Sequence, residues 1–186
     1  MLRALAERWW ATTNTFHFGF GEMAVTPLDF SMLTGLRCGG GPIPWYRDLQ
    51  RTPEVLSYYL GMPASESSML PGYISCFALR EYYRHYDYST PETRDTLPRA
   101  FILYMLGTSL FSSVDNTVSL GPLVALVDFN NIARYDWGGA GLATMYGYMG
   151  GIAHRLIMRT CGFYHIWEVC NSLQVFLRLP YQRFCY

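Results

Sequence analysis

The sequence predicts a mainly α-helical fold: a single compact multi-helix bundle with a small β-hairpin near the N-terminus. Its longer apolar segments exceed the usual length of a strand, and threonine followed by proline and an acid opens several of them. Alternating aromatic residues near the N-terminus indicate the hairpin. A chain of 186 residues with 51% apolar side chains suits one domain with a sizeable core, so we assign residues 1–186 to one domain.

The first elements are a short helix and the hairpin. Residues 2–10 place apolar side chains on one helical face. Phe16, Phe18 and Phe20 then alternate with smaller or polar residues, which is the period of a strand. Glycines follow as a turn, and residues 23–25 are expected to return as a second strand.

The next helix has the most complete local signals. Thr26 is the expected N-cap, a proline occupies the first helical position, and Asp29 completes a capping-box pattern. Val25 and Phe30 are spaced as a hydrophobic staple, and Gly35 is the expected C-cap. The Thr-Pro-acid opening recurs at residues 52–54 and 90–92, where proline and an acid suit the first turn of a helix.

Helices are also expected at residues 71–83, 97–111, 120–132, 138–159 and 165–179. Residues 97–111 are apolar nearly all round, so this helix is expected at the centre of the core.

Small residues recur at every fourth position of the helix predicted at 138–159, namely Gly139, Ala143, Gly147 and Gly151. They predict a smooth ridge against which a neighbouring backbone packs closely. A Gly147→Leu substitution is therefore expected to unfold the domain or to lower its melting temperature sharply.

The basic residues limit the chemistry of the chain. All 14 are arginine, so no side chain can form a Schiff base or act as a phosphate-loop lysine. The chain also has no metallophosphatase motif such as Gly-Asp-x-His-Gly, so we predict no enzyme, no cofactor and no metal site. A formal net charge of zero argues against direct nucleic-acid binding, which usually needs a basic excess.

The cysteines favour a reducing compartment. There are five, an odd number, and they form no CxxC pair. The set His154, Cys161, His165 and Cys170 would have to bind zinc across two predicted helices, so buried thiols are the preferred interpretation. We expect no signal peptide and no membrane span, because the longest uncharged stretch is short and rich in glycine.

Two polar sets remain as candidate sites. His17 and Glu22 could act as an acid–base pair, although a structural hydrogen bond is favoured; His85 and Asp87 are assigned to a polar loop. Tyrosine and arginine are enriched at protein interfaces, so a second set is the candidate partner-binding site. It consists of Tyr82, Tyr83, Arg84 and Tyr86. Stacking on nucleic-acid bases and a plain hydrated helix edge are the alternatives.

Ordered motifs through the chain resemble the plant mobile domain family. Residues 5–9 are similar to its "ERW" helix, residues 14–26 to its "TFHF–FGEM–VT" hairpin, and residues 29–36 to its "D–ML–GL" helix. Residues 99–111, 126–140 and 172–176 are similar to its central helix, its "L–D–YSWG–A" segment and its "LQLW" helix. The residues that carry the resemblance are Trp9, Phe16, His17, Gly21, Glu22, Met23, Thr26, Asp29, Gly35, Leu36, Gly107, Asp128, Trp137 and Gly138.

This resemblance implies a non-catalytic protein-interaction module. Members of the family are associated with nuclear silencing of transposable elements, gene expression and meristem maintenance. The family's "aminotransferase-like" label cannot hold for this chain, because pyridoxal phosphate needs a lysine. A type-7 serine/threonine phosphatase-like protein is the implied partner, and a transposon-derived module associated with nucleic acid is the alternative function. The protein is expected in the nucleus, otherwise in the cytoplasm, and it is not expected to be secreted. The family's domain continues past its "LQLW" helix, so residues 1–186 are expected to be the N-terminal portion of that domain.

Overall fold

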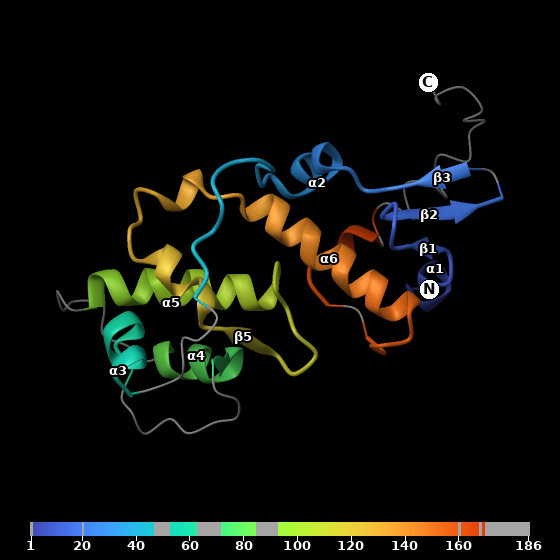
Figure 1. The fold of residues 1–186 in the computed structure, drawn as a ribbon. Coiled ribbons are helices and arrows are strands. Elements are labelled where there is room, and N and C mark those ends of the chain that lie inside the picture. Colours follow the sequence, from blue (N-terminus) through green and yellow to red (C-terminus); the bar gives the residue numbers. More distant parts are fainter. Residues whose placement is uncertain are drawn as a thin grey trace.

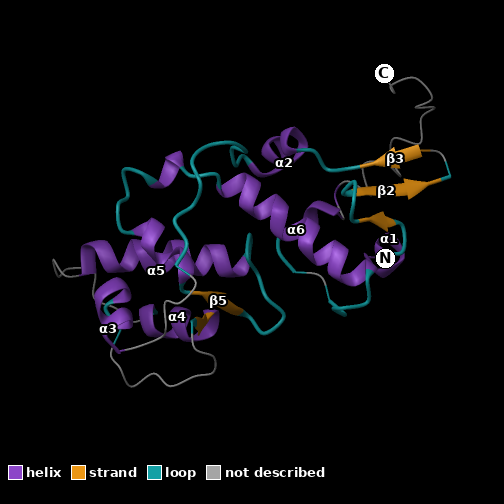
Figure 2. Cartoon of the chain, viewed as in Figure 1, coloured by secondary structure: helices purple, strands orange, loops and turns teal. Residues whose placement is uncertain are grey.

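The computed structural model describes residues 2–19, 21–46, 53–62, 72–84, 93–159, 161–167 and 169. The fold is mainly helical, as predicted, and its two longest described helices lie in the middle of the molecule (Figure 1, Figure 2). These are α5 (Thr93–Thr108) and α6 (Trp137–Ala153). The N-terminal strands lie beside the end of α6 that is remote from α5 (Figure 1).

The N-terminal elements form a three-stranded antiparallel sheet rather than a hairpin alone. Helix α1 spans Leu2–Ala6, and the strands are β1 (Trp9–Trp10), β2 (Thr15–Phe18) and β3 (Gly21–Met23). The prediction of a helix to residue 10 was wrong at its end, because Trp9 pairs with Phe16 across β1 and β2. The predicted hairpin is confirmed, but its second strand is Gly21–Met23 rather than residues 23–25, and His17 lies opposite Glu22.

Helix α2 (Pro27–Thr34) has the ends that the sequence predicted. The Thr26 hydroxyl accepts a hydrogen bond from the Asp29 backbone N–H at 3.2 Å, and the Thr26 N–H donates to the Asp29 carboxylate at 2.9 Å. Gly35 ends the helix with a φ of 71°. Phe30 is fully buried in α2, and Val25 beside the cap is buried in the same cluster.

The middle of the chain forms short elements around α5. They are α3 (Pro53–Val55), the π-helical turn η1 (Leu56–Leu60), β4 (Tyr73–Ser75), α4 (Cys76–Tyr83) and β5 (Thr117–Ser119). The predicted helix over residues 71–83 was wrong in its first half, because β4 pairs with β5 from more than 40 residues later. The Thr-Pro-Glu opening at residues 90–92 lies outside the described residues.

The expected helix over residues 120–132 is replaced by two 3-10 turns, η2 (Gly121–Leu126) and η3 (Ile132–Arg134). Between them the Asp128 carboxylate accepts hydrogen bonds from the Asn130 N–H at 2.9 Å and the Asn131 side chain at 2.5 Å, which closes a turn. Helix α6 ends at Ala153 rather than residue 159, and Arg155 follows with a φ of 59°. Of the last predicted helix, residues 165–167 are helical, and most of the remainder lies outside the described residues.

The buried side chains form two clusters that α5 connects. Leu106 and Leu110 belong to the first cluster, which includes α2, α6 and the N-terminal sheet. Ala100 and Leu103 belong to the second, which includes η1, α4, β5 and η2. Helix α5 is therefore central, as predicted, although Phe101 and Met105 are exposed on its outer face.

The predicted ridge on α6 was also wrong. Ala143 and Gly147 are exposed, and no atom lies within 4 Å of a side chain added at Gly147. The face of α6 that packs includes Gly141, where an added Cβ would lie 2.5 Å from Leu110. Because α6 is apolar all round, its sequence could not indicate which face is buried.

Candidate functional site

The His17–Glu22 pair lies in a polar network on the partly exposed face of the sheet. The His17 Nε2 atom is 3.1 Å from the Thr15 hydroxyl and 3.6 Å from the Glu22 carboxylate. The His17 ring stacks on the exposed Trp10 ring at 4.5 Å, with 10° between the planes. The Thr15 hydroxyl donates to Glu22 at 3.3 Å, so each polar group of the pair has a structural role.

Two further motif residues of the sheet, Trp9 and Phe16, form an aromatic cluster with Trp167. Trp9 and Phe16 are buried with ring centroids 4.8 Å apart, and Trp167 contacts both at 5.7 and 5.1 Å. The Trp9 indole N–H is buried without a hydrogen-bond partner in the described part of the chain. Met23 and Leu36 pack against the same cluster.

Two of the motif glycines outside the sheet allow close packing. A Cβ at Gly107 would lie 2.5 Å from Val118 and 2.8 Å from the Cys76 sulfur. A Cβ at Gly138 would lie 2.5 Å from the Arg37 carbonyl oxygen. Both positions therefore require glycine for steric reasons.

Asp136, which stands where the family's "YSWG" segment has serine, has a role that the sequence analysis missed. Its carboxylate accepts hydrogen bonds from the Gly139 N–H at 2.7 Å, as the N-cap of α6, and from the Gly39 N–H at 2.9 Å. The neighbouring Trp137 donates its indole N–H to the Ile132 carbonyl at 2.8 Å. An acid directly before an apolar helix is an N-cap signal, and it could have been recognised from the sequence.

The candidate tyrosine site makes contacts inside the molecule. The Tyr82 hydroxyl donates to the Gly61 carbonyl at 2.8 Å, and the Tyr83 hydroxyl donates to the Leu60 carbonyl. Both side chains are half-buried against the second cluster. Arg84 is exposed and lies 3.3 Å from Glu81, whereas Tyr86 lies outside the described residues.

Among the described α-helices, the most exposed apolar surface is on α2. Leu28 and Met32 are 70% and 79% exposed, one helical turn apart, and Leu33 is 42% exposed beside them. We call these three residues the α2 face. The caps and the buried Phe30 fix the helix, so the α2 face is rigidly held. The Tyr146 hydroxyl adds a hydrogen bond from α6 to the Val25 carbonyl just before α2.

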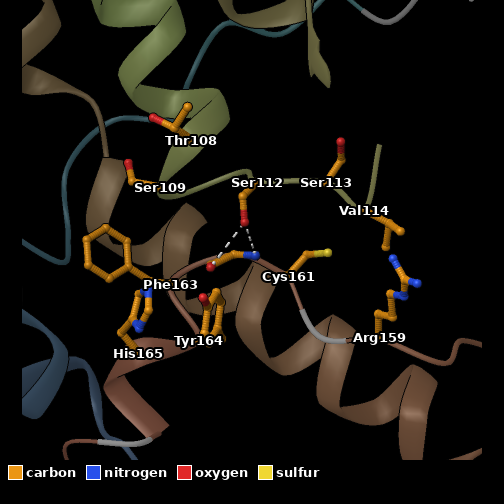
Figure 3. Close-up of a pocket in the computed structure, with 11 residues that line it drawn as sticks. Thr108, Ser109, Ser112, Ser113, Val114, Arg159, Cys161, Phe163, Tyr164 and His165 are labelled. Atoms are coloured by element: carbon orange, nitrogen blue, oxygen red, sulfur yellow. Dashed lines mark hydrogen bonds between the residues drawn. The ribbon is translucent and has the colours of Figure 1, made fainter. Parts of the chain in front are cut away.

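A cavity of about 370 Å³ lies between the C-terminal end of α5 and the segment after α6 (Figure 3). The Ser112 hydroxyl joins its two sides by accepting from the Gly162 N–H at 2.7 Å and donating to the Gly162 carbonyl at 3.2 Å. Burial raises the pKa of the Cys161 thiol, although a hydrogen bond with the Tyr148 side chain acts in the opposite direction. The thiol therefore stays protonated near neutral pH and is a poor nucleophile.

The described residues offer little for metal or membrane binding. Among them no three His, Cys, Asp or Glu side chains are grouped to hold a metal ion, and Cys170 of the zinc hypothesis lies outside them. None of the helices in these ranges combines the length and the apolar character needed to cross a membrane.

Comparison with known proteins gives curated plant relatives. The chain is 32% identical to Protein MAIN-LIKE 2 of Arabidopsis thaliana over 164 residues, which cover 87% of this chain and 24% of that protein. It is 28% identical to Protein MAINTENANCE OF MERISTEMS of Arabidopsis thaliana, over 83% of this chain and 33% of that protein. It is also 30% identical to the Serine/threonine-protein phosphatase 7 long form homolog of the same plant, over 87% of this chain and 12% of that protein.

The chain thus spans at most a third of the length of these relatives. No solved structure matches it. The family model of the plant mobile domain matches residues 1–177, nearly the whole chain. With the sheet, the capped α2 and the motif glycines in place, the chain belongs to the plant mobile domain family.

Proposed function

We propose that this chain is a non-catalytic protein-interaction module and that it docks an apolar helix of a protein partner on the α2 face. The observation that carries the proposal is the exposure of Leu28 and Met32 on a helix whose two ends are both capped. Amphipathic helices bind such surfaces through apolar residues one turn apart. A rigid surface loses little conformational entropy on binding, which favours this role.

The composition supports contact rather than catalysis. Pyridoxal-phosphate chemistry needs a lysine, and the chain has none. The thiol in the cavity is protonated near neutral pH, and the His17–Glu22 pair is part of a structural network. None of these groups is arranged as an activated nucleophile with its base.

The partner is proposed to be a protein and not a nucleic acid. The formal net charge is zero, and phosphate neutralisation by basic residues supplies most nucleic-acid affinity. One relative is itself named as a type-7 serine/threonine phosphatase homolog, so a phosphatase of this type is the partner we propose. The proposed setting is the nucleus, in meristem maintenance and in the silencing of transposable elements.

The test is binding of purified type-7 phosphatase-like protein to the chain, together with capture from plant nuclear extract. We expect Leu28→Asp with Met32→Asp to abolish binding, because two charges would be buried in an apolar contact. Leu156→Asp is the matched control, since Leu156 is equally exposed, at 79%, outside α2.

Binding that the α2 substitutions leave unchanged would refute the docking surface. Steep salt-dependent binding to DNA or RNA, without protein capture, would instead establish the alternative nucleic-acid function.

A further inference from the structure

The hydroxyl groups around the cavity share one property. Four serine and threonine side chains line it, and each donates its proton to a backbone carbonyl oxygen of this chain. The pairs are Thr108 to Tyr104 at 2.9 Å, Ser109 to Met105 at 2.5 Å, Ser112 to Gly162 at 3.2 Å and Ser113 to Thr117 at 2.9 Å. A hydroxyl group has one proton and two lone pairs, so these groups can offer a ligand only acceptors. Ser112 and Ser113 already accept the Gly162 and Thr117 backbone N–H groups, at 2.7 and 2.9 Å, so the acceptors for a ligand come mainly from Thr108 and Ser109.

Two further features of the lining favour positive charge. Thr108 is the last residue of α5, so the negative end of the helix dipole lies at the cavity. Phe163 and Tyr164 line the same cavity, and the faces of aromatic rings attract cations. Acceptors, a helix C-terminus and aromatic rings together are complementary to a donor-rich cation.

Arg159 is the lining residue with a permanent positive charge, which opposes this interpretation. Its side chain lies beside Val114, at the end of the cavity away from Phe163 and His165 (Figure 3). Arg159 is exposed, so water and salt screen its charge. An anion would need several donors at its binding site, and the serine and threonine protons are already used.

We propose that the cavity binds the guanidinium or ammonium group of an arginine or lysine side chain presented by a protein partner. The inference rests on the proposed function, because it adds a charged anchor to the apolar contact at the α2 face. A volume of about 370 Å³ accommodates such a side chain, since ligand sites commonly measure roughly 300–1,000 Å³.

The test is an NMR titration of the complete chain with acetyl-arginine amide. We expect saturable shifts of the Ser109, Ser112 and Gly162 amides. Acetyl-citrulline amide has nearly the same shape without the charge and is expected to cause none. Thr108→Val and Ser109→Ala should each weaken binding about fivefold by removing one acceptor. Thr12→Val, at an exposed threonine in the N-terminal turn, is the matched control and should leave it unchanged.

Arg159→Ala separates a cation site from an anion site. We expect it to leave arginine binding equal or tighter, because a like charge is removed. Binding of inorganic phosphate that is lost in Arg159→Ala, or an equal response to citrulline and arginine, would overturn the inference. Circular dichroism of every variant establishes that its fold is intact.

The outcome also separates this inference from the proposed function. If partner capture depends on the α2 face while the acetyl-arginine amide fails to bind, the cavity inference is wrong and the interaction function stands. If the amide binds but no partner is captured, the cation site stands, but both the proposed function and a partner's side chain as the occupant are refuted.

Discussion

Gly107 and Gly147 both lie inside long helices, but their surroundings are opposite. A Cβ at Gly107 would meet Val118 and Cys76 at 2.5 and 2.8 Å, whereas a Cβ at Gly147 would meet nothing within 4 Å. We expect Gly107→Ala to lower the free energy of unfolding by about 1–3 kcal/mol through overpacking. Gly147→Ala should raise it by about 0.5–1 kcal/mol, because alanine is the better helix former.

Chemical denaturation of the two variants measures both effects. Because the substitution is the same and both positions are helical, each variant is the control for the other. If Gly147→Ala destabilised the protein instead, the result would support the packed ridge that the spacing of small residues predicted.

Burial also gives the free energy of unfolding a pH dependence. It raises the pKa values of Cys76, Cys161, Tyr146 and Tyr148, all of which are neutral when protonated. The folded state therefore binds these protons more tightly than the unfolded state does. The resulting stabilisation is fully present below the pKa values of the unfolded chain, the lowest of which is about 8.5. We expect the free energy of unfolding to fall as the pH rises from about 8 to 10.

Urea denaturation at several pH values measures this slope. Cys76→Ala lowers stability at every pH by leaving a small cavity, but it should also flatten the slope. An unchanged slope in this variant would mean that Cys76 does not contribute to the pH dependence.

At the scale of elements, Asp136 joins the start of α6 to the loop that follows α2. One carboxylate oxygen accepts from both the Gly139 and the Gly39 N–H groups. Removing an N-cap costs about 1 kcal/mol, and leaving the second donor unpaired adds to that cost. We expect Asp136→Ala to lower the free energy of unfolding by roughly 1–3 kcal/mol, measured by thermal or chemical denaturation.

Asp136→Asn is the control for that prediction, because an amide oxygen accepts the same hydrogen bonds. It should retain most of the stability. If the asparagine variant were as unstable as the alanine variant, the negative charge at the helix start would be the cause instead.

At the scale of the whole molecule, α5 and the residues beside it join the two clusters. Leu106 packs in one and Leu103 in the other, while Ile102 and Trp137 contact both. We therefore expect the chain to unfold in one cooperative transition. Leu103→Ala and Leu106→Ala should each lower the free energy of unfolding by about 2–5 kcal/mol without splitting that transition.

Tryptophan fluorescence and far-ultraviolet circular dichroism, followed together during denaturation, test this cooperativity. Coincident curves are expected for the unmodified chain and for both variants. Separate midpoints would mean that the two clusters are independent folding units.

The sequence by itself determined the features that depend on neighbouring residues. The capping box of Thr26 and Asp29, the left-handed Gly35 and the structural hydrogen bonds of His17 and Glu22 are present as predicted. These follow from backbone geometry within a few residues, and local chemistry decides them. The motif order likewise identified the family, which the match over residues 1–177 confirms.

Only the tertiary structure decided the features that depend on distant segments. Trp9 and residues 73–75 became strands because Phe16 and residues 117–119 pair with them. The packed face of α6 and the exposed face of α5 depend on which neighbours cover them. The cavity joins segments some 50 residues apart, Ser112 to Gly162. An apolar pattern indicates that burial is favourable, but the three-dimensional arrangement decides which side chains are buried against neighbours and which remain exposed.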